Sequence, residues 1–363
     1  MKRIGYLMSL VVVLWACQSE PVSSLTRITS FTKKDFVSLT QITSDILTFE
    51  IPFAKPVSLI CLNDRLMVVI ESAGSHTNLI KVLDLRSGQL VQQFGKQGRG
   101  PGEFMDISSV HYSETEQRLD LYDGIMRRFT QYSLAELTSA TIPDQPHIID
   151  LTTSLPAYDF LEACLIGDHT VCGVAMNNQH QILVCDKNRT VCLGYGELKE
   201  GTADPTLPEN ILENSMWLAP HPTAKRVAFF MSFADVLGII DLDKKALQKH
   251  HGPDQFSPVY PAFSLGNGLE SYGFTDDTRN AYNGIVTSDR YIWGLYSGRH
   301  VKQYMTRCFY VHVFDWSGNP LHRYELDQPL SNFCLMPNGK GFYGITYDEN
   351  SEQIVRFDVE EQW

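Results

Sequence analysis

The sequence has little positive charge and no concentrated patch of it. Thirty Lys and Arg residues stand against 42 Asp and Glu residues, which gives a formal net charge of −12. After the N-terminus, no run of basic residues is longer than two. Nucleic-acid binding and adsorption to an anionic membrane surface both depend on clustered Lys and Arg. We therefore expect no nucleic-acid partner and no electrostatic attachment to a membrane.

The sequence also lacks the local signatures of common catalytic and metal sites. It contains no Gly-x-Ser-x-Gly, no His-Glu-x-x-His, no Cys-x-x-Cys and no Gly-Lys-Ser/Thr. Its histidines are scattered, and they form no recognisable set with serine and aspartate. These absences favour a protein that is not an enzyme, and we expect no cofactor and no metal.

The N-terminus is typical of an export signal. Met1-Lys2-Arg3 is a short basic stretch, and the apolar stretch Ile4–Leu14 that follows is too short to span a bilayer permanently. Leu14-Trp15-Ala16-Cys17 then resembles the lipobox of bacterial lipoproteins. The resemblance implies removal of residues 1–16, lipidation of Cys17 and a membrane anchor. Gln18 implies delivery to the outer membrane, facing the periplasm or the cell surface.

The remainder divides into a short N-terminal stretch and one large domain. Residues 17–43 are rich in Ser and Thr and weakly patterned, so we interpret them as a lipidated N-terminus and tether. Residues 44–363 carry a recurring strand–turn–strand unit, first seen as Leu59–Leu62 followed by Arg65–Ile70. A third strand follows each unit, and fourth strands are recognisable in several, for example Leu90–Phe94.

The spacing of these units predicts the fold. Their second strands begin near residues 66, 118, 170, 226, 291 and 341, at intervals of 52, 52, 56, 65 and 50. Six units of four short strands at this period predict an all-β, six-bladed β-propeller. The strand Ile46–Ile51 has no unit of its own. We expect it to pair with the last blade and close the ring.

The most specific stretch is Gly95–Phe104, with four glycines and one proline in ten residues. Such a composition excludes the interior of a helix or strand, so the stretch is a shaped corner between the first two blades. With the signal, the lipobox and the six units, it resembles the NHL-like/TolB-like six-bladed propeller lipoproteins of gut-type Gram-negative bacteria. That family has no general activity. Arg99 and Glu103 are candidate ligand-binding residues, although such a loop is more often only a corner.

Four cysteines fall one per strand in the third unit: Cys164, Cys172, Cys185 and Cys192. The turns between them lie near the midpoints, which predicts one row across the blade. Three interpretations stay open. The cysteines are small buried hydrophobic residues, or Cys172 and Cys185 form a cross-strand disulfide, or the group binds zinc, which the missing Cys-x-x-Cys spacing disfavours.

Two long connections are the predicted recognition surface. The interval Phe256–Tyr282 is rich in aromatic and polar residues, and Ser297–Arg307 is interpreted as a second long loop. Aromatic rings with polar neighbours suit a glycan or a peptide. The alternative is that the loops pack against their own blades. The candidate ligand-binding residues here are Tyr260, Tyr272, Arg299, His300 and Tyr304.

The sequence thus predicts a lipid-anchored envelope propeller that binds a glycan, peptide or protein partner without catalysis. One alternative is a metal-dependent hydrolase or lyase at the mouth of the propeller, as in lactonase-like propellers. Asp64, Asp106 and His111 are the residues considered for it. A second alternative is a scaffold subunit of an envelope complex, for which a large apolar patch is expected.

Overall fold

The computed structural model describes most of the chain. The described residues are 22–23, 25–72, 78–176, 178–188, 191–197, 215–258, 262–266, 269–304, 307–347 and 351–359. Among them, no helix combines the length and the hydrophobicity needed to cross a membrane.

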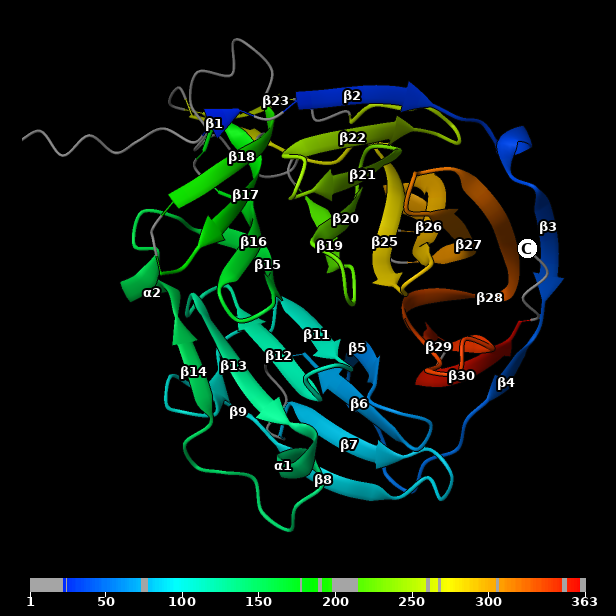
Figure 1. The fold of residues 1–363 in the computed structure, drawn as a ribbon. Coiled ribbons are helices and arrows are strands. Elements are labelled where there is room, and N and C mark those ends of the chain that lie inside the picture. Colours follow the sequence, from blue (N-terminus) through cyan, green and yellow to red (C-terminus); the bar gives the residue numbers. More distant parts are fainter. Residues whose placement is uncertain are drawn as a thin grey trace, which may run out of the picture.

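Six antiparallel blades surround a central axis, as predicted (Figure 1). The first three blades consist of four consecutive strands each. Blade 1 is β5 (Pro56–Cys61), β6 (Leu66–Glu71), β7 (Ile80–Asp84) and β8 (Leu90–Phe94). Blade 2 is β11 (Ser109–Ser113), β12 (Arg118–Asp123), β13 (Arg128–Ser133) and β14 (His147–Asp150). Blade 3 is β15 (Phe160–Ile166), β16 (Thr170–Ala175), β17 (His180–Asp186) and β18 (Val191–Glu197).

Blade 4 follows the same pattern, whereas blades 5 and 6 depart from it because they share one long strand. Blade 4 is β19 (Met216–Pro220), β20 (Arg226–Met231), β21 (Val236–Asp241) and β22 (Ala246–His251). Blade 5 is β25 (Arg279–Thr287), β26 (Tyr291–His300), β27 (Cys308–Asp315) and the first half of β28 (Pro320–Leu335). Blade 6 is the second half of β28, β29 (Gly341–Tyr347), β30 (Glu352–Asp358) and the N-terminal strand β4 (Ser44–Ile46).

Burial on both faces explains why the central strands are apolar throughout. All six residues of β6 are buried. Because successive side chains of a strand point to opposite faces, Val68 packs in a cluster with blade 2, whereas Met67 packs in a cluster with blade 6. Each blade therefore supplies core to both neighbours.

Polar side chains near the axis join the inner strands of neighbouring blades. Each one bonds to the backbone of the next inner strand, so the seams are closed by hydrogen bonds as well as by apolar contact. These bonds are Ser109 Oγ to Ala163 O at 2.6 Å, Leu218 N to Glu162 at 3.2 Å, Trp217 Nε1 to Tyr282 O at 3.2 Å, Asn283 Nδ2 to Ser331 O at 2.8 Å and Leu59 N to Asn332 Oδ1 at 3.0 Å.

The interpretation of residues 25–42 as a tether is wrong. This segment, here called the belt, runs around the outside of blades 4 and 5 (Figure 1). Its strand β2 (Leu25–Ser30) pairs in parallel with β22, and β3 (Ser38–Ile42) pairs in parallel with β28. A 3₁₀ turn (Lys33–Asp35) joins them, and the short β1 (Val22–Ser23) pairs with β18.

Two aromatic residues fix the belt to blade 5. Phe31 and Phe36 are 6% and 8% exposed, and their ring centroids lie 5.4 and 5.5 Å from that of Phe314. Both rings belong to the core between blades 4 and 5. The segment looked unpatterned because β3 is largely exposed and only these isolated aromatic residues point inward.

The ring closes through an N-terminal strand, as predicted, but at shifted bounds. The strand is β4 (Ser44–Ile46) rather than Ile46–Ile51, and it pairs antiparallel with β30. The apolar residues that follow it pack on the core between blades 1 and 6. These residues are apolar because they are partly buried, and their apolar sequence led to the prediction of a strand. Further, β28 runs without interruption from blade 5 into blade 6.

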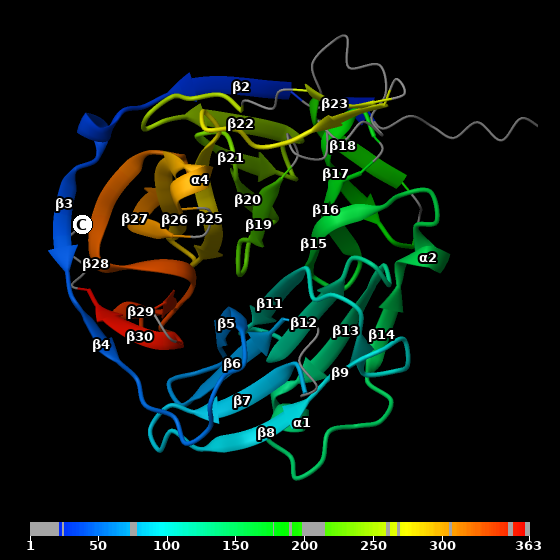
Figure 2. The same ribbon diagram turned by 180° about the vertical axis from the view of Figure 1, so that it is seen from behind.

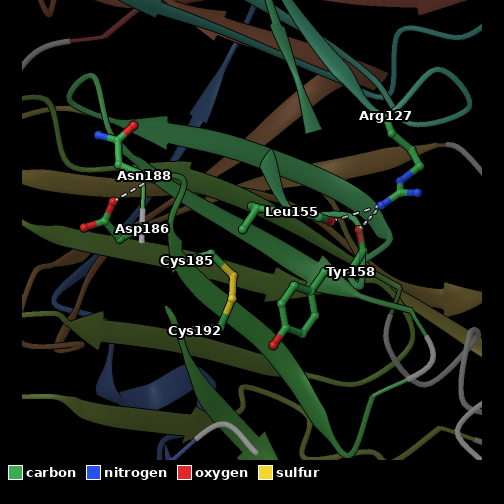
Figure 3. Close-up of a disulfide and its surroundings, with 7 residues drawn as sticks. All are labelled: Arg127, Leu155, Tyr158, Cys185, Asp186, Asn188 and Cys192. Atoms are coloured by element: carbon green, nitrogen blue, oxygen red, sulfur yellow. Dashed lines mark hydrogen bonds between the residues drawn. A yellow bond between two sulfur atoms is a disulfide. The ribbon is translucent and has the colours of Figure 1, made fainter. Parts of the chain in front are cut away.

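Blade 3 contains a disulfide, but the predicted pair is wrong. The bond joins Cys185 to Cys192 across β17 and β18 (Figure 3). The register pairs Cys172 with Val184, so Cys172 and Cys185 are offset by one residue and point to opposite faces. Cys164 and Cys172 face blade 4 as free thiols, whereas the disulfide packs with the blade 2 side near Tyr158. The predicted single row is therefore two rows.

Candidate functional site

The longest connections lie on one face of the propeller. Because the strands of each blade are antiparallel, second-to-third connections and blade-to-blade connections share a face, here called the loop face, which is towards the viewer in Figure 2. The interval Phe256–Tyr282 contains the hairpin β23 (Ala262–Gly266) and β24 (Leu269–Tyr272). Ser297–Arg307 is not a long loop, since β26 extends through His300 and α4 (Val301–Tyr304) follows.

The glycine-rich corner is built around Glu103. Its carboxylate accepts a hydrogen bond from Gly100 N at 2.7 Å, and a Cβ on Gly98 would lie 2.2 Å from Oε2. Arg128 donates to the carbonyls of Gly100 and Glu103 at 2.8 and 2.7 Å. These contacts give Glu103 a structural role in the loop. Arg99 is exposed, 4.0 Å from Met126 Sδ.

The other predicted ligand-binding residues do not join this corner. Arg299 stacks on Phe309, with its guanidinium carbon 3.9 Å from the ring centroid, and His300 is exposed at the end of β26. Tyr272 pairs with Ala262 within the hairpin and Tyr304 ends α4. Tyr260 lies outside the described residues. The corner is between blades 1 and 2 and Arg299 is on blade 5, so the set is not one site.

The residues considered for metal catalysis are also separated. Asp64 lies in the turn between β5 and β6, on the face opposite Asp106, which precedes β11. His111 lies within β11, where burial lowers the pKa of the imidazole to about 4. Among the described residues, no three His, Cys, Asp or Glu side chains are grouped so that they could hold a metal ion.

Glu162, beside the propeller axis, has the most perturbed carboxyl group among the inner strands. Burial raises its pKa from an ordinary value of 4.5 to about 8, against the opposing effect of the Leu218 amide. An unfolded chain binds fewer protons than the folded chain between these values. Stability therefore falls as the pH rises from about 4.5 to about 8. Glu162→Gln keeps an acceptor for Leu218 and carries no charge.

We expect Glu162→Gln to raise the free energy of unfolding by on the order of 2 kcal/mol at pH 9, and by much less at pH 5. Urea unfolding at both pH values measures the difference. The exposed Glu114 provides the control, because Glu114→Gln should have little effect at either pH. An equal effect of Glu162→Gln at pH 5 and pH 9 would contradict the assigned ionisation.

A basic pocket at the outer rim is the candidate binding site. It has a volume of about 560 Å³ and lies between the belt, the outer part of blade 4 and the β27–β28 turn of blade 5. We call it the rim pocket. Its lining is Arg27, Thr29, Ser30, Phe31, Arg226, Lys244, Gln248, His250, Ser317, Gly318, Asn319 and Pro320. The turns at Lys244 and Ser317 place it on the face opposite the loop face.

The cations of the rim pocket are held from three separate elements. Arg226, at the start of β20, donates to the backbone carbonyl of Trp316, and its guanidinium carbon lies 5.3 Å from the Trp316 ring centroid. Among the described residues, its buried Nε has no hydrogen-bond partner. Lys244 pairs with Asp241 at 2.9 Å, and Arg27 is exposed on β2.

His250 adds a polar ring atom to the rim pocket. Its Nδ1 lies 2.8 Å from Thr29 Oγ1, and its Nε2 is buried without a hydrogen-bond partner in the described part of the chain. Burial lowers the pKa of His250, against the opposing charge of Asp315. The imidazole is therefore neutral at pH 7. When Thr29 donates to Nδ1, the proton is on Nε2 and that atom is a donor.

A second depression on blade 1 has a similar volume but a different charge. Arg65, Asp84 and Arg86 contribute to its lining, and Arg65 Nε lies 2.5 Å from Asp84. The arginine next to Asp84 lowers the pKa of that carboxyl group to about 2. This ion pair neutralises much of the site. The twelve residues that line the rim pocket include no Asp or Glu.

Sequence reasoning missed the rim pocket because its parts are remote from one another. Arg27 lies on a segment that was interpreted as a tether, and His250 lies on β22, an outer strand whose mostly half-buried residues give only a weak pattern. Only the pairing of Thr29 with His250 and of Arg27 with Gln248 brings the belt to this site. The sequence contained only an indirect indication of a basic pocket, namely scattered Lys and Arg residues in a chain with an excess of Asp and Glu.

Comparisons with known proteins agree on the fold. A family model described as TolB-like 6-blade propeller-like matches residues 30–338. A Bacteroides fragilis protein described as exported has a TM-score of 0.54 at 12% identity, covering 92% of this chain and 100% of that chain. A member of the DUF4221 family from Bacteroides vulgatus has a TM-score of 0.50 at 11% identity, covering 88% and 96%. No curated protein matches the sequence.

Proposed function

Since this chain belongs to the TolB-like six-blade propeller family, whose name describes a fold and no reaction, we propose that it is an exported, lipid-anchored protein that binds an anionic ligand without catalysis. The ligand carries a phosphate or sulfate group, and the rim pocket is its site. The observation that supports this most directly is charge. Three cations and no carboxylate line the rim pocket of a chain whose net charge is −12.

The donors in the rim pocket suit the oxygens of a phosphate or sulfate. Guanidinium groups present planar pairs of N–H donors that match such oxyanions, and an ammonium supplies a mobile charge. Arg226 is already oriented by Trp316, so little side-chain entropy is lost when it binds. The side chains of Ser30 and Asn319 add uncharged polar groups.

The proposed lipid anchor at Cys17 is close in sequence to Arg27 of the rim pocket. Arg27 follows Cys17 by ten residues, and ten residues span at most roughly 35 Å when extended. A lipidated Cys17 would therefore keep the rim pocket near a membrane. Loss of palmitate incorporation in Cys17→Ser, with an unchanged circular dichroism spectrum, tests the anchor. Incorporation that persists in this variant would exclude it.

Inorganic phosphate and sulfate are the probes for the rim pocket. The exposed cations are removed in Arg27→Gln Lys244→Gln, while Arg226 is kept because it also holds the Trp316 backbone. Titration calorimetry should show at least a tenfold loss of affinity in this variant, since hydrogen bonds to charged groups are worth roughly 1.5–3 kcal/mol each. A matched control is Lys225→Gln Arg290→Gln, which removes the same charge from exposed positions outside the rim pocket.

Equal losses of affinity in both double variants would mean that binding depends on overall charge, which would contradict a specific site. Absence of measurable binding by the native chain would also contradict the proposal. The source of the oxyanion is then resolved by two further probes. Binding to vesicles of anionic phospholipid that depends on Arg27 and Lys244 indicates a lipid headgroup, whereas binding only to a soluble sugar phosphate indicates a free ligand.

A further inference from the structure

Two free cysteines meet where the first blade contacts the last. Cys61 ends β5 of blade 1, and Cys334 lies in the second half of β28 in blade 6, 273 residues later. Their Sγ atoms are 3.4 Å apart. Cys334 is only 2% exposed, and both side chains belong to the core between these two blades.

The backbone around the pair is already fixed in position. Leu59 N donates to Asn332 Oδ1 at 3.0 Å. Leu59 precedes Cys61 by two residues and Asn332 precedes Cys334 by two, and residues two apart on a strand point to the same side. The contact that aligns the two inner strands therefore also aligns the two thiols. The sulfurs need to move together by only about 1.4 Å to reach a bonded separation of about 2.0 Å.

The other free cysteines lack this arrangement. Cys164 and Cys172 are opposite one another on adjacent strands of a single blade, so a bond between them would join strands that are already paired. Cys308 is buried in blade 5, in a core cluster with no other cysteine among its described members. Among the free cysteines that the structure describes, only the pair of Cys61 and Cys334 would connect two blades.

We propose that Cys61 and Cys334 form a second disulfide that covalently closes the propeller ring. The Cys185–Cys192 bond requires a compartment that permits disulfides, and the same compartment would permit the second bond, independently of what the rim pocket binds. The oxidant is the disulfide of a thiol–disulfide oxidoreductase or of a small molecule. One cysteine thiolate attacks it and forms a mixed disulfide, and the second thiolate then displaces the reduced oxidant. Two thiol protons are released, and the oxidant gains two electrons.

The bond would add a covalent link between the first and last blades, which are otherwise held together by the shared core and by hydrogen bonds. At its outer edge, on the side away from the two cysteines, blade 6 is completed by β4, which pairs with β30 through three residue pairs, Val355 with Ile46, Arg356 with Asp45 and Phe357 with Ser44. A cross-link between residues this far apart in sequence restricts the unfolded chain strongly, because the entropy of the closed loop grows with its length. It would make separation of the first and last blades impossible without chain cleavage or reduction.

Peptide mapping of the full chain tests the bond directly. The protein is incubated with oxidised glutathione, alkylated without reduction and digested. We expect a linked pair of peptides that contain Cys61 and Cys334, and the Cys185–Cys192 link serves as an internal standard. If the standard is linked while Cys61 and Cys334 both carry alkyl groups or glutathione, the proposal is wrong.

Thermal unfolding with and without dithiothreitol gives a second, independent readout. Reduction breaks both disulfides in the native chain but only Cys185–Cys192 in Cys61→Ser. The loss of Tm on reduction should therefore be larger in the native chain by roughly 5–10 °C. Equal losses in the two proteins would overturn the proposal. Because each protein is compared with itself, a general destabilisation by the substitution does not affect the result.

Discussion

Removal of residues 1–43 should abolish the soluble, monomeric propeller. The deletion leaves the hydrogen-bonding edges of β22 and β28 open, and it exposes the part of the core that Phe31 and Phe36 fill. Open strand edges are templates for intermolecular pairing. We expect aggregates on size-exclusion chromatography, whereas removal of residues 1–21 should leave a monomer. A folded monomer after the longer deletion would return the belt to the role of a tether.

A double substitution in the belt tests the same packing contacts and perturbs the chain less than the deletion. Burying a phenylalanine contributes about 3–5 kcal/mol relative to alanine, and a typical domain is stable by only about 5–15 kcal/mol. Phe31→Ala Phe36→Ala should therefore lose on the order of 5 kcal/mol or fail to fold. Leu39→Ala, at a belt position that is 53% exposed, is the control and should change stability by less than about 0.5 kcal/mol. Urea unfolding followed by tryptophan fluorescence measures both.

Replacement of Asp123 by alanine should cost on the order of 4 kcal/mol. Its buried carboxylate accepts from the amides of Met105 at 2.7 Å, Asp106 at 3.3 Å and Met126 at 2.8 Å. These bonds hold the end of the glycine-rich corner to blade 2. Without them three backbone donors lose a charged acceptor, and each such bond is worth roughly 1.5–3 kcal/mol. The loss is measured as a lower midpoint in urea unfolding.

Asp106→Ala is the matched control, because it removes an exposed carboxylate from the same corner. It should change stability by less than about 0.5 kcal/mol. If the two aspartates give equal losses, the corner is stabilised by charge in general and not by the Asp123 contacts. Asp123→Asn should fall between the two, since its single carbonyl oxygen can replace only one of the two carboxylate oxygens.

The blades were predictable because each is a local unit. The strand Leu90–Phe94 has the expected bounds, since a short apolar run followed by turn residues can be recognised within about twenty residues of sequence. The fourth strands of blades 2 and 4 were missed. His147–Asp150 and Ala246–His251 are outer strands with fewer buried residues, so their pattern is weak.

The candidate site was not predictable, because it depends on register and on long-range pairing. A shift of one residue between β16 and β17 decided which cysteines could bond. The rim pocket requires Arg27 to lie beside Gln248. A local sequence pattern does not predict a pairing between residues that are so far apart in the chain. The aromatic loops were predicted to form the recognition surface because binding sites are commonly found on loops. Here the cations gather on the opposite face.

Two N-terminal strands, β3 of the belt and β4, pair with parts of the chain that are synthesised last. β3 pairs with residues 322–326, and β4 pairs with residues 355–357. When the N-terminal half has left the ribosome, these strands have no partner, and β4 cannot complete blade 6 until β30 has been synthesised. Such non-local contacts make folding slow. The ring therefore cannot close before the C-terminal strands have been synthesised.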